Sequence, residues 1–193
     1  MKHLLCILGF LLFGTALHGA AIIVYARGES AMVDAIAAPD KPADPAKAAF
    51  LATFQADLMH PAAWAEPIKL TDFPVYGRDV PGAGGMIQFH ESFPGGVVLK
   101  VALMGLLPGH KYILTLNGNP ERAGNDRLVD PVPGNEAEKY FDFQTVTTDA
   151  MGQFMATFAI ALPKGPYDVR FYVKDTDDFK IVLYHDFFRF EVE

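Results

Sequence analysis

Residues 167–174 read Tyr-Asp-Val-Arg-Phe-Tyr-Val-Lys. Every odd position of this stretch carries a large apolar side chain, and three of its four even positions carry a charge. A period of two is typical of a β-strand that buries one face and exposes the other. One buried and one wet face are usual in antiparallel sheets. The stretch therefore predicts a strand of an antiparallel sheet.

Similar strand patterns fill the chain from Met86 onward, without a helical segment between them. Loops rich in Gly, Pro, Asp and Asn separate them. The seven expected strands are residues 86–90, 97–104, 111–117, 141–148, 153–162, 167–174 and 180–193. Many short strands joined by turns predict a mainly β protein with an antiparallel β-sandwich over residues 69–193.

The last expected strand changes phase. Ile181 and Leu183 share one parity, whereas Phe188 and Phe190 share the other. Because a register slip would move one of these sets out of the core, the simplest explanation is a β-bulge between Tyr184 and Phe188.

Two connections have related sequences: residues 106–112 read Leu-Leu-Pro-Gly-His-Lys-Tyr, and residues 162–167 read Leu-Pro-Lys-Gly-Pro-Tyr. The first resembles the L-x-P-G-x-x-Y tyrosine corner of fibronectin type III domains and other immunoglobulin-like sandwiches. That resemblance covers residues 86–193 and implies a tyrosine hydroxyl bonded to the backbone upstream. The immunoglobulin cysteine pair is absent, and the single Trp64 lies outside the expected strands.

A second resemblance concerns residues 148–152, Thr-Asp-Ala-Met-Gly, and the strand from Val169 to Asp175. These stretches are similar to the small secreted β-sandwich proteins of bacteria and archaea. That group has no established activity, so this resemblance implies a fold and leaves the function open.

Residues 1–21 have the three parts of a secretory signal peptide. Met-Lys-His precedes an apolar run from Leu4 to Phe13, and small-residue triplets follow at 14–16 and 19–21. The short apolar run favours a cleaved signal. The alternative is an uncleaved anchor, the one case in which membrane contact is expected. Both predict an exported protein that is periplasmic, secreted or at the cell surface.

Residues 22–68 are rich in Ala and Pro and predict a linker with one short helix. Asp44 suits the N-cap, Pro45 suits the first helical position, and Phe50, Phe54 and Leu58 recur every four residues before His60-Pro61. This apolar stripe is expected to pack on the chain's own domain or to dock on a partner.

Composition excludes several classes of protein. The formal net charge of −7 argues against nucleic-acid binding, which requires clustered Lys and Arg. The single Cys6 lies in the expected signal peptide, which leaves no cysteine for disulfides, thiolate metal sites or nucleophilic catalysis. Neither serine, Ser30 or Ser92, lies in a G-x-S-x-G motif. No cofactor is expected.

The connection at residues 119–139 is long for a compact domain, and such loops are often functional. Its oxygen-bearing side chains, together with one from the preceding strand, are candidate ligand-binding residues: Asn117, Asn119, Asn125, Asp126 and Asp130. They could also bind calcium, although Arg122 and Arg127 oppose a cation and the spacing matches no known calcium loop. The alternative is that this loop has no binding function and only connects two strands.

Two further sets of residues are candidates. Tyr172 and Tyr184 are expected on the polar face of the sheet, where exposed tyrosines can stack on sugars or contact a protein. His185 and Asp186, at the expected bulge, are candidate metal ligands, with His90 and His110 as additional candidates.

The sequence thus favours an exported, non-catalytic binding module. It is expected to recognise a protein or a glycan, at the cell surface or in the periplasm, through the 119–139 loop and the adjacent sheet face. The alternatives are a metal-dependent enzyme or metal carrier that uses strand and loop His and Asp, and a structural protein of cell-surface assemblies.

Overall fold

A computed structural model describes residues 21–26, 31–33, 64–73, 77–118, 131–132 and 135–193. All of its described regular structure is β-strand. The strands are β1 (Ala21–Ala26), β2 (Ala31–Val33), β3 (Ile68–Leu70), β4 (Gly84–Phe89), β5 (Ser92–Phe93), β6 (Gly96–Met104), β7 (Lys111–Gly118), β8 (Pro131–Val132), β9 (Asn135–Thr147), β10 (Phe154–Ala161), β11 (Gly165–Asp175) and β12 (Ile181–Val192).

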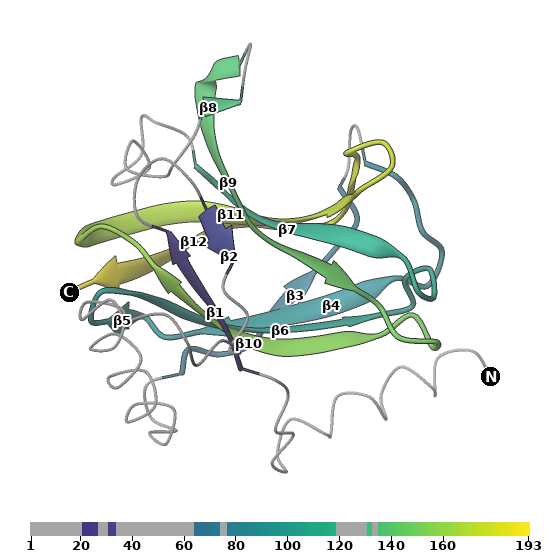
Figure 1. The fold of residues 1–193 in the computed structure, drawn as a ribbon, viewed down its shortest axis with the longest axis horizontal. Coiled ribbons are helices and arrows are strands. Elements are labelled where there is room, and N and C mark those ends of the chain that lie inside the picture. The colour runs from purple at the N-terminus through teal and green to yellow at the C-terminus, as the bar shows by residue number, and fades with distance from the viewer. Residues whose placement is uncertain (1–20, 27–30, 34–63, 74–76, 119–130, 133–134) are drawn as a thin grey trace.

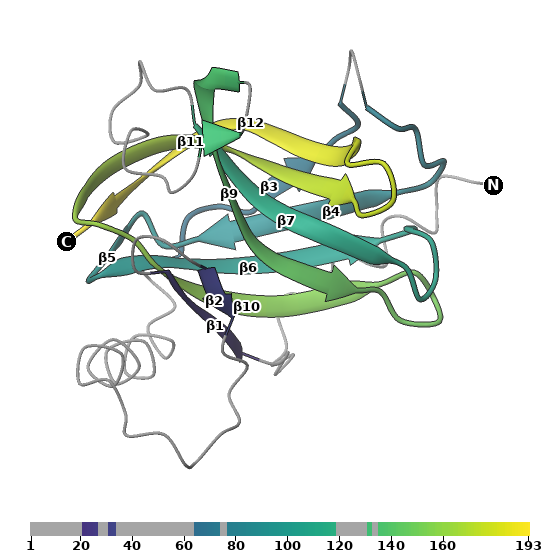
Figure 2. The ribbon, with the colours of Figure 1, turned by 45° about the horizontal axis from the view of Figure 1, so that its top comes forward.

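The strands form two six-stranded sheets. The first sheet has the order β2-β1-β10-β6-β4-β3, and the second has the order β5-β12-β11-β7-β9-β8. Figure 1 shows the two sheets as separate layers, and Figure 2 shows the second sheet lying across the first. Most pairs are antiparallel, but β1 runs parallel to β10 and β5 runs parallel to β12. All seven expected strands are present, which confirms the mainly β prediction.

One core lies between the sheets. Phe89 of the first sheet and Phe188 of the second have ring centroids 4.8 Å apart, and Phe143 and Phe158 approach to 5.4 Å in the same way. Leu114, Leu116, Phe171 and Val173 belong to one buried cluster with inward residues of the first sheet. Burying these apolar surfaces is the main stabilising contribution available to a chain with one cysteine.

The expected bulge in β12 is confirmed. Pairing passes from Val169 opposite Phe188 to Phe171 opposite His185. Asp186 and Phe187 therefore both face Arg170, and the extra residue returns Phe188 to the inward face.

Both sequence turns tie a tyrosine to the upstream backbone. The Tyr167 hydroxyl donates to the Pro163 carbonyl at 2.7 Å, and the Leu107 N–H donates to the Tyr112 hydroxyl at 3.1 Å. The turn before Tyr112 also depends on Gly105, whose φ is 68°. A Cβ there would lie 2.1 Å from the Gly82 carbonyl oxygen, so only glycine permits this approach.

Two expectations, the signal segment and the helix after Asp44, concern segments with little described structure. The signal segment 1–21 lies outside the described residues except for Ala21, which begins β1, and the helix expected after Asp44 also lies outside them. Strand structure nevertheless occurs before residue 69, in β1, β2 and β3. Among the described residues, no helix has the length and apolarity needed to cross a membrane.

The 119–139 connection is partly regular. The sequence suggested one long loop, but β8 and the first residues of β9 form an antiparallel pair within it, with Pro131 opposite Lys139. The sequence pattern did not reveal this pair, because the two paired segments are short and Pro and Gly residues lie in and between them. Residues 119–130 and 133–134 lie outside the described part.

Candidate functional site

The outward face of the second sheet carries a group of charged, polar and aromatic side chains around Arg170. Arg170 of β11 stands at the bulge and makes three contacts there. Its Nε lies 3.2 Å from Asp186 Oδ1, its guanidinium lies 4.1 Å from the Phe187 ring centroid, and its Nη1 donates to Asn117 Oδ1 at 3.4 Å. The bulge thus places an acid and an aromatic ring around one guanidinium. These positions are held by strands, which makes the group rigid.

The two expected tyrosines lie side by side on this face. Tyr172 and Tyr184 are directly paired across β11 and β12. The Phe73 ring packs edge-on against both, with centroids 5.9 Å from Tyr172 and 5.0 Å from Tyr184. Tyr172 is only 3% exposed, so the expectation of an exposed Tyr172 is wrong. The sequence pattern could not reveal that a distant segment, residue 73, packs on this face.

A second charged group lies further across the same face. The Lys174 ammonium is 2.5 Å from Asp142 Oδ1, and Thr115 Oγ1 donates to the same oxygen at 2.6 Å. Thr115 and Asn117 are fully buried polar residues of β7. These buried polar side chains are hydrogen-bonded to charged neighbours. Such a network fixes the positions of the polar groups on this face.

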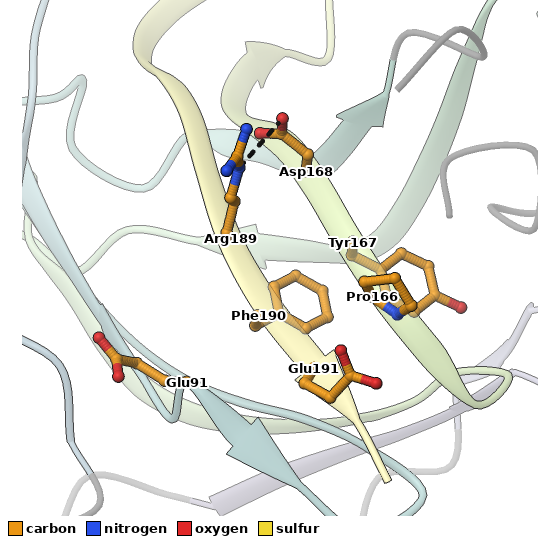
Figure 3. A pocket seen from close by; sticks show the side chains of 7 residues that line it. All are labelled: Glu91, Pro166, Tyr167, Asp168, Arg189, Phe190 and Glu191. Atoms are coloured by element: carbon orange, nitrogen blue, oxygen red, sulfur yellow. Dashed lines mark ion pairs between the residues drawn. The ribbon is translucent and has the colours of Figure 1, made fainter. Parts of the chain in front are cut away.

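A cavity of about 670 Å³ opens beside the end of β12. Figure 3 shows Asp168 and Arg189 facing each other across β11 and β12, Glu191 near Pro166, and Glu91 on the segment between β4 and β5. Arg189 Nε lies 3.3 Å from Asp168 Oδ2, and the Arg189 side chain is 81% exposed. The remaining lining residues are Pro166, Tyr167 and Phe190.

Charge in this cavity is unbalanced. Asp168 pairs with Arg189, whereas Glu91 and Glu191 form no ion pair among the described residues. Glu191 donates its backbone N–H to the Glu91 carbonyl at 2.7 Å, which fixes the two residues near each other. The cavity therefore offers two free carboxylates and an exposed guanidinium beside apolar walls. Carboxylates only accept hydrogen bonds and guanidinium only donates them, so together they match ligand groups that do both.

The three histidines in the described part of the chain, His90, His110 and His185, do not gather in one place. His185 Nδ1 lies 3.3 Å from the Lys69 carbonyl, whereas Asp186 pairs with Arg170. The proposed metal pair thus has separate partners on β3 and β11. His90 contacts Trp64, with ring centroids 4.2 Å apart, on the first sheet.

His110 belongs to a buried charge cluster around Asp175. Among the described residues, His110, Asp175 and Asp177 are the group whose ligand atoms lie within 4.8 Å of one another, as a metal site would need. However, Asp175 Oδ2 accepts from Arg78 at 2.8 Å, and Oδ1 accepts from His110 at 2.9 Å and from the Asp177 N–H at 2.8 Å. Burial acts to raise the pKa of Asp175, but these hydrogen bonds and the Arg78 charge outweigh it and hold the pKa below its usual range. Both oxygens are occupied, so the cluster is built to join loops.

The sequence found part of this site. Of its ligand-binding candidates, Asn117, Tyr172 and Tyr184 come together on the outward face of the second sheet, whereas Asn119, Asn125, Asp126 and Asp130 lie outside the described residues. It missed Arg170 and the cavity residues Arg189 and Glu191. The signal for these was present, because they occupy outward positions next to or beyond the predicted bulge.

Comparison with family models, with curated proteins and with solved structures found no match.

Proposed function

We propose that this protein is an exported, non-catalytic binding module with an immunoglobulin-like β-sandwich. Strand order supports the fold. Immunoglobulin-type sandwiches place strands A, B and E in one sheet and C, F and G in the other. Here β4, β6 and β10 adjoin in the first sheet, and β7, β11 and β12 adjoin in the second, with β9 added beside β7.

The Tyr167 hydrogen bond supports the same fold. In immunoglobulin domains the tyrosine corner stands near the start of strand F, and its hydroxyl bonds to the backbone a few residues upstream. Tyr167 lies near the start of β11 and donates to Pro163, four residues earlier. The turn before Tyr112 uses its hydroxyl as an acceptor instead.

The cavity beside β12 is the observation that carries the function. It joins free carboxylates, a guanidinium and apolar walls, all on or next to strands. Sugar hydroxyls both donate and accept hydrogen bonds, and sugar rings have apolar faces, so a glycan fits this lining best. The Arg170, Phe187 and Asp186 group continues the surface along the same two strands. A protein ligand is the other outcome of the test.

Glycan arrays with matched variants test the proposal. Glu191→Gln and Arg189→Gln each remove a charge from an exposed cavity residue, whereas Asp79→Asn removes one from an exposed residue that does not line the cavity. We expect the two cavity variants to weaken glycan binding at least about tenfold and the control variant to bind normally. Glu191→Gln and Asp79→Asn should keep the wild-type melting temperature, whereas Arg189→Gln, which removes the exposed partner of the buried Asp168, should lower it slightly.

Two outcomes contradict this reading. Unchanged glycan binding by both cavity variants removes the cavity from recognition. If no glycan binds but a purified protein ligand does, and the same variants weaken that complex, the ligand is a protein.

A further inference from the structure

Part of the outward face of the first sheet, on β4, β6 and β10, is apolar and buried, although Met155 on the same face is 42% exposed and Gln88, Lys100 and Thr157 are half-buried. Val98 of β6 is 1% exposed and Ala159 of β10, directly opposite, is 0% exposed. Their sequence neighbours Val97, Leu99, Phe158 and Ile160 belong to the core between the sheets, so Val98 and Ala159 point the other way. Ala102, Ala161 and Met86 on the same face are also buried.

No described strand accounts for this burial. Each of the twelve strands belongs to one of the two sheets, so none of them lies over this face. The side chain that does lie on it is Trp64. The Lys100 ammonium stands 3.6 Å from the Trp64 ring centroid, and burial lowers the pKa of Lys100.

The path of the chain leads to the same face. β2 is the outermost strand of the first sheet and ends at Val33, and the next described residue is Trp64, which forms an isolated bridge with His90 just after β4. The described chain therefore leaves the sheet at β2, its outermost strand, and is next described at Trp64, beside the end of β4. The distance from β2 to β4 is four strand spacings, about 19 Å.

The intervening sequence contains an element of suitable size. The helix that the sequence predicts would span residues 45–59, and fifteen helical residues would extend about 22 Å. Phe50, Phe54 and Leu58 form one apolar stripe, with alanines around it that permit a close approach. Small outward side chains such as Ala102 and Ala159 leave room for large ones to pack between them.

We propose that the helix of residues 45–59 docks on the outward face of the first sheet, with Phe50, Phe54 and Leu58 over Val98 and Ala159. The chain thereby covers this face with its own segment. Only the outward face of the second sheet then remains for a ligand. The inference does not depend on the proposed glycan binding.

The sole tryptophan supplies a direct test in the full chain, because Trp64 lies on the covered face. Phe54→Glu places a charge in the stripe, whereas Ala56→Glu places the same charge on the opposite side of the helix. We expect Phe54→Glu to shift Trp64 fluorescence to longer wavelength and to lower the melting temperature. Ala56→Glu should change neither.

A double-mutant cycle keeps the test decisive if Phe54→Glu does not fold. Phe54→Ala and Val98→Ala, alone and together, should lower the melting temperature less in combination than the sum of the single shifts, because each removes the other's partner. Additive shifts with unchanged Trp64 emission overturn the proposal. So does a helix variant that turns a dimer into a monomer, since the occupant is then a second copy.

Discussion

At the scale of single residues, Asp175 is the side chain on which most local structure depends. It is fully buried and joins Arg78, His110 and the Asp177 backbone, which come from three loops at one end of the molecule (Figure 1). Asp175→Asn keeps the shape and removes the charge. We expect a loss of about 2–3 kcal/mol of unfolding free energy at pH 7, measured by urea denaturation. Asp177→Asn, an exposed neighbour, should cost far less, and equal losses would show that the buried carboxylate is not special.

Asp175 also predicts a pH dependence. Its pKa in the folded protein lies below the usual range, so folding favours its charged form. That contribution is fully present above about pH 4, the ordinary aspartate pKa, and is lost as the pH falls through the folded value. The stability difference between wild type and Asp175→Asn should therefore shrink as the pH is lowered below about 4. A difference that stays constant in acid would contradict this assignment of charge.

At the scale of elements, deletion of one residue can remove the bulge in β12. Deleting Phe187 leaves Asp186 alone opposite Arg170 and keeps Phe188 inward, so the strand becomes regular. We expect the deletion to fold, with a loss of about 1 kcal/mol from the missing ring contact with Arg170. Deleting Tyr172 from the regular centre of β11 should instead unfold the protein, because it turns Val173 outward. Circular dichroism and thermal melting separate the two outcomes, and two equally damaged variants would refute the distinction.

The elements also show what the sequence could reveal. Alternation within residues 167–174 and the phase change before Phe188 are local signals, so the strands and the bulge were predictable. The pairing of β1 with β10 joins Ala21 to Thr157, and nothing local in either segment encodes it. The Asp175 cluster was missed for the same reason, since Arg78, His110 and Asp175 meet only after the sheets pack. Phe73 against Tyr172 is a third contact of this kind.

At the scale of the whole molecule, the placement of polar and charged side chains bears on the choice between the proposed binding function and a metal-dependent one. The outward face of the first sheet has a buried apolar area around Val98 and Ala159 with Lys100 beside it, whereas that of the second presents Arg170, Lys174, Asp142 and the cavity beside β12. The described histidines are divided among His90 beside the first sheet, His110 in the loop cluster and His185 opposite Phe171.

Cation titration of the intact protein tests the metal-dependent alternative. Because Arg78 already neutralises Asp175 and donors occupy both of its oxygens, Zn²⁺ would have to displace these donors to bind Asp175 beside His110 and Asp177. We expect Zn²⁺ and EDTA to leave the melting temperature unchanged, whereas a ligand at a hundred times its Kd would add about 2.7 kcal/mol of stability. A rise with Zn²⁺ that His110→Ala abolishes would restore the metal-dependent reading. A rise with Ca²⁺ that Asn125→Ala and Asp126→Ala abolish would assign calcium to the 119–130 segment, and binding through that segment would then be cation-dependent.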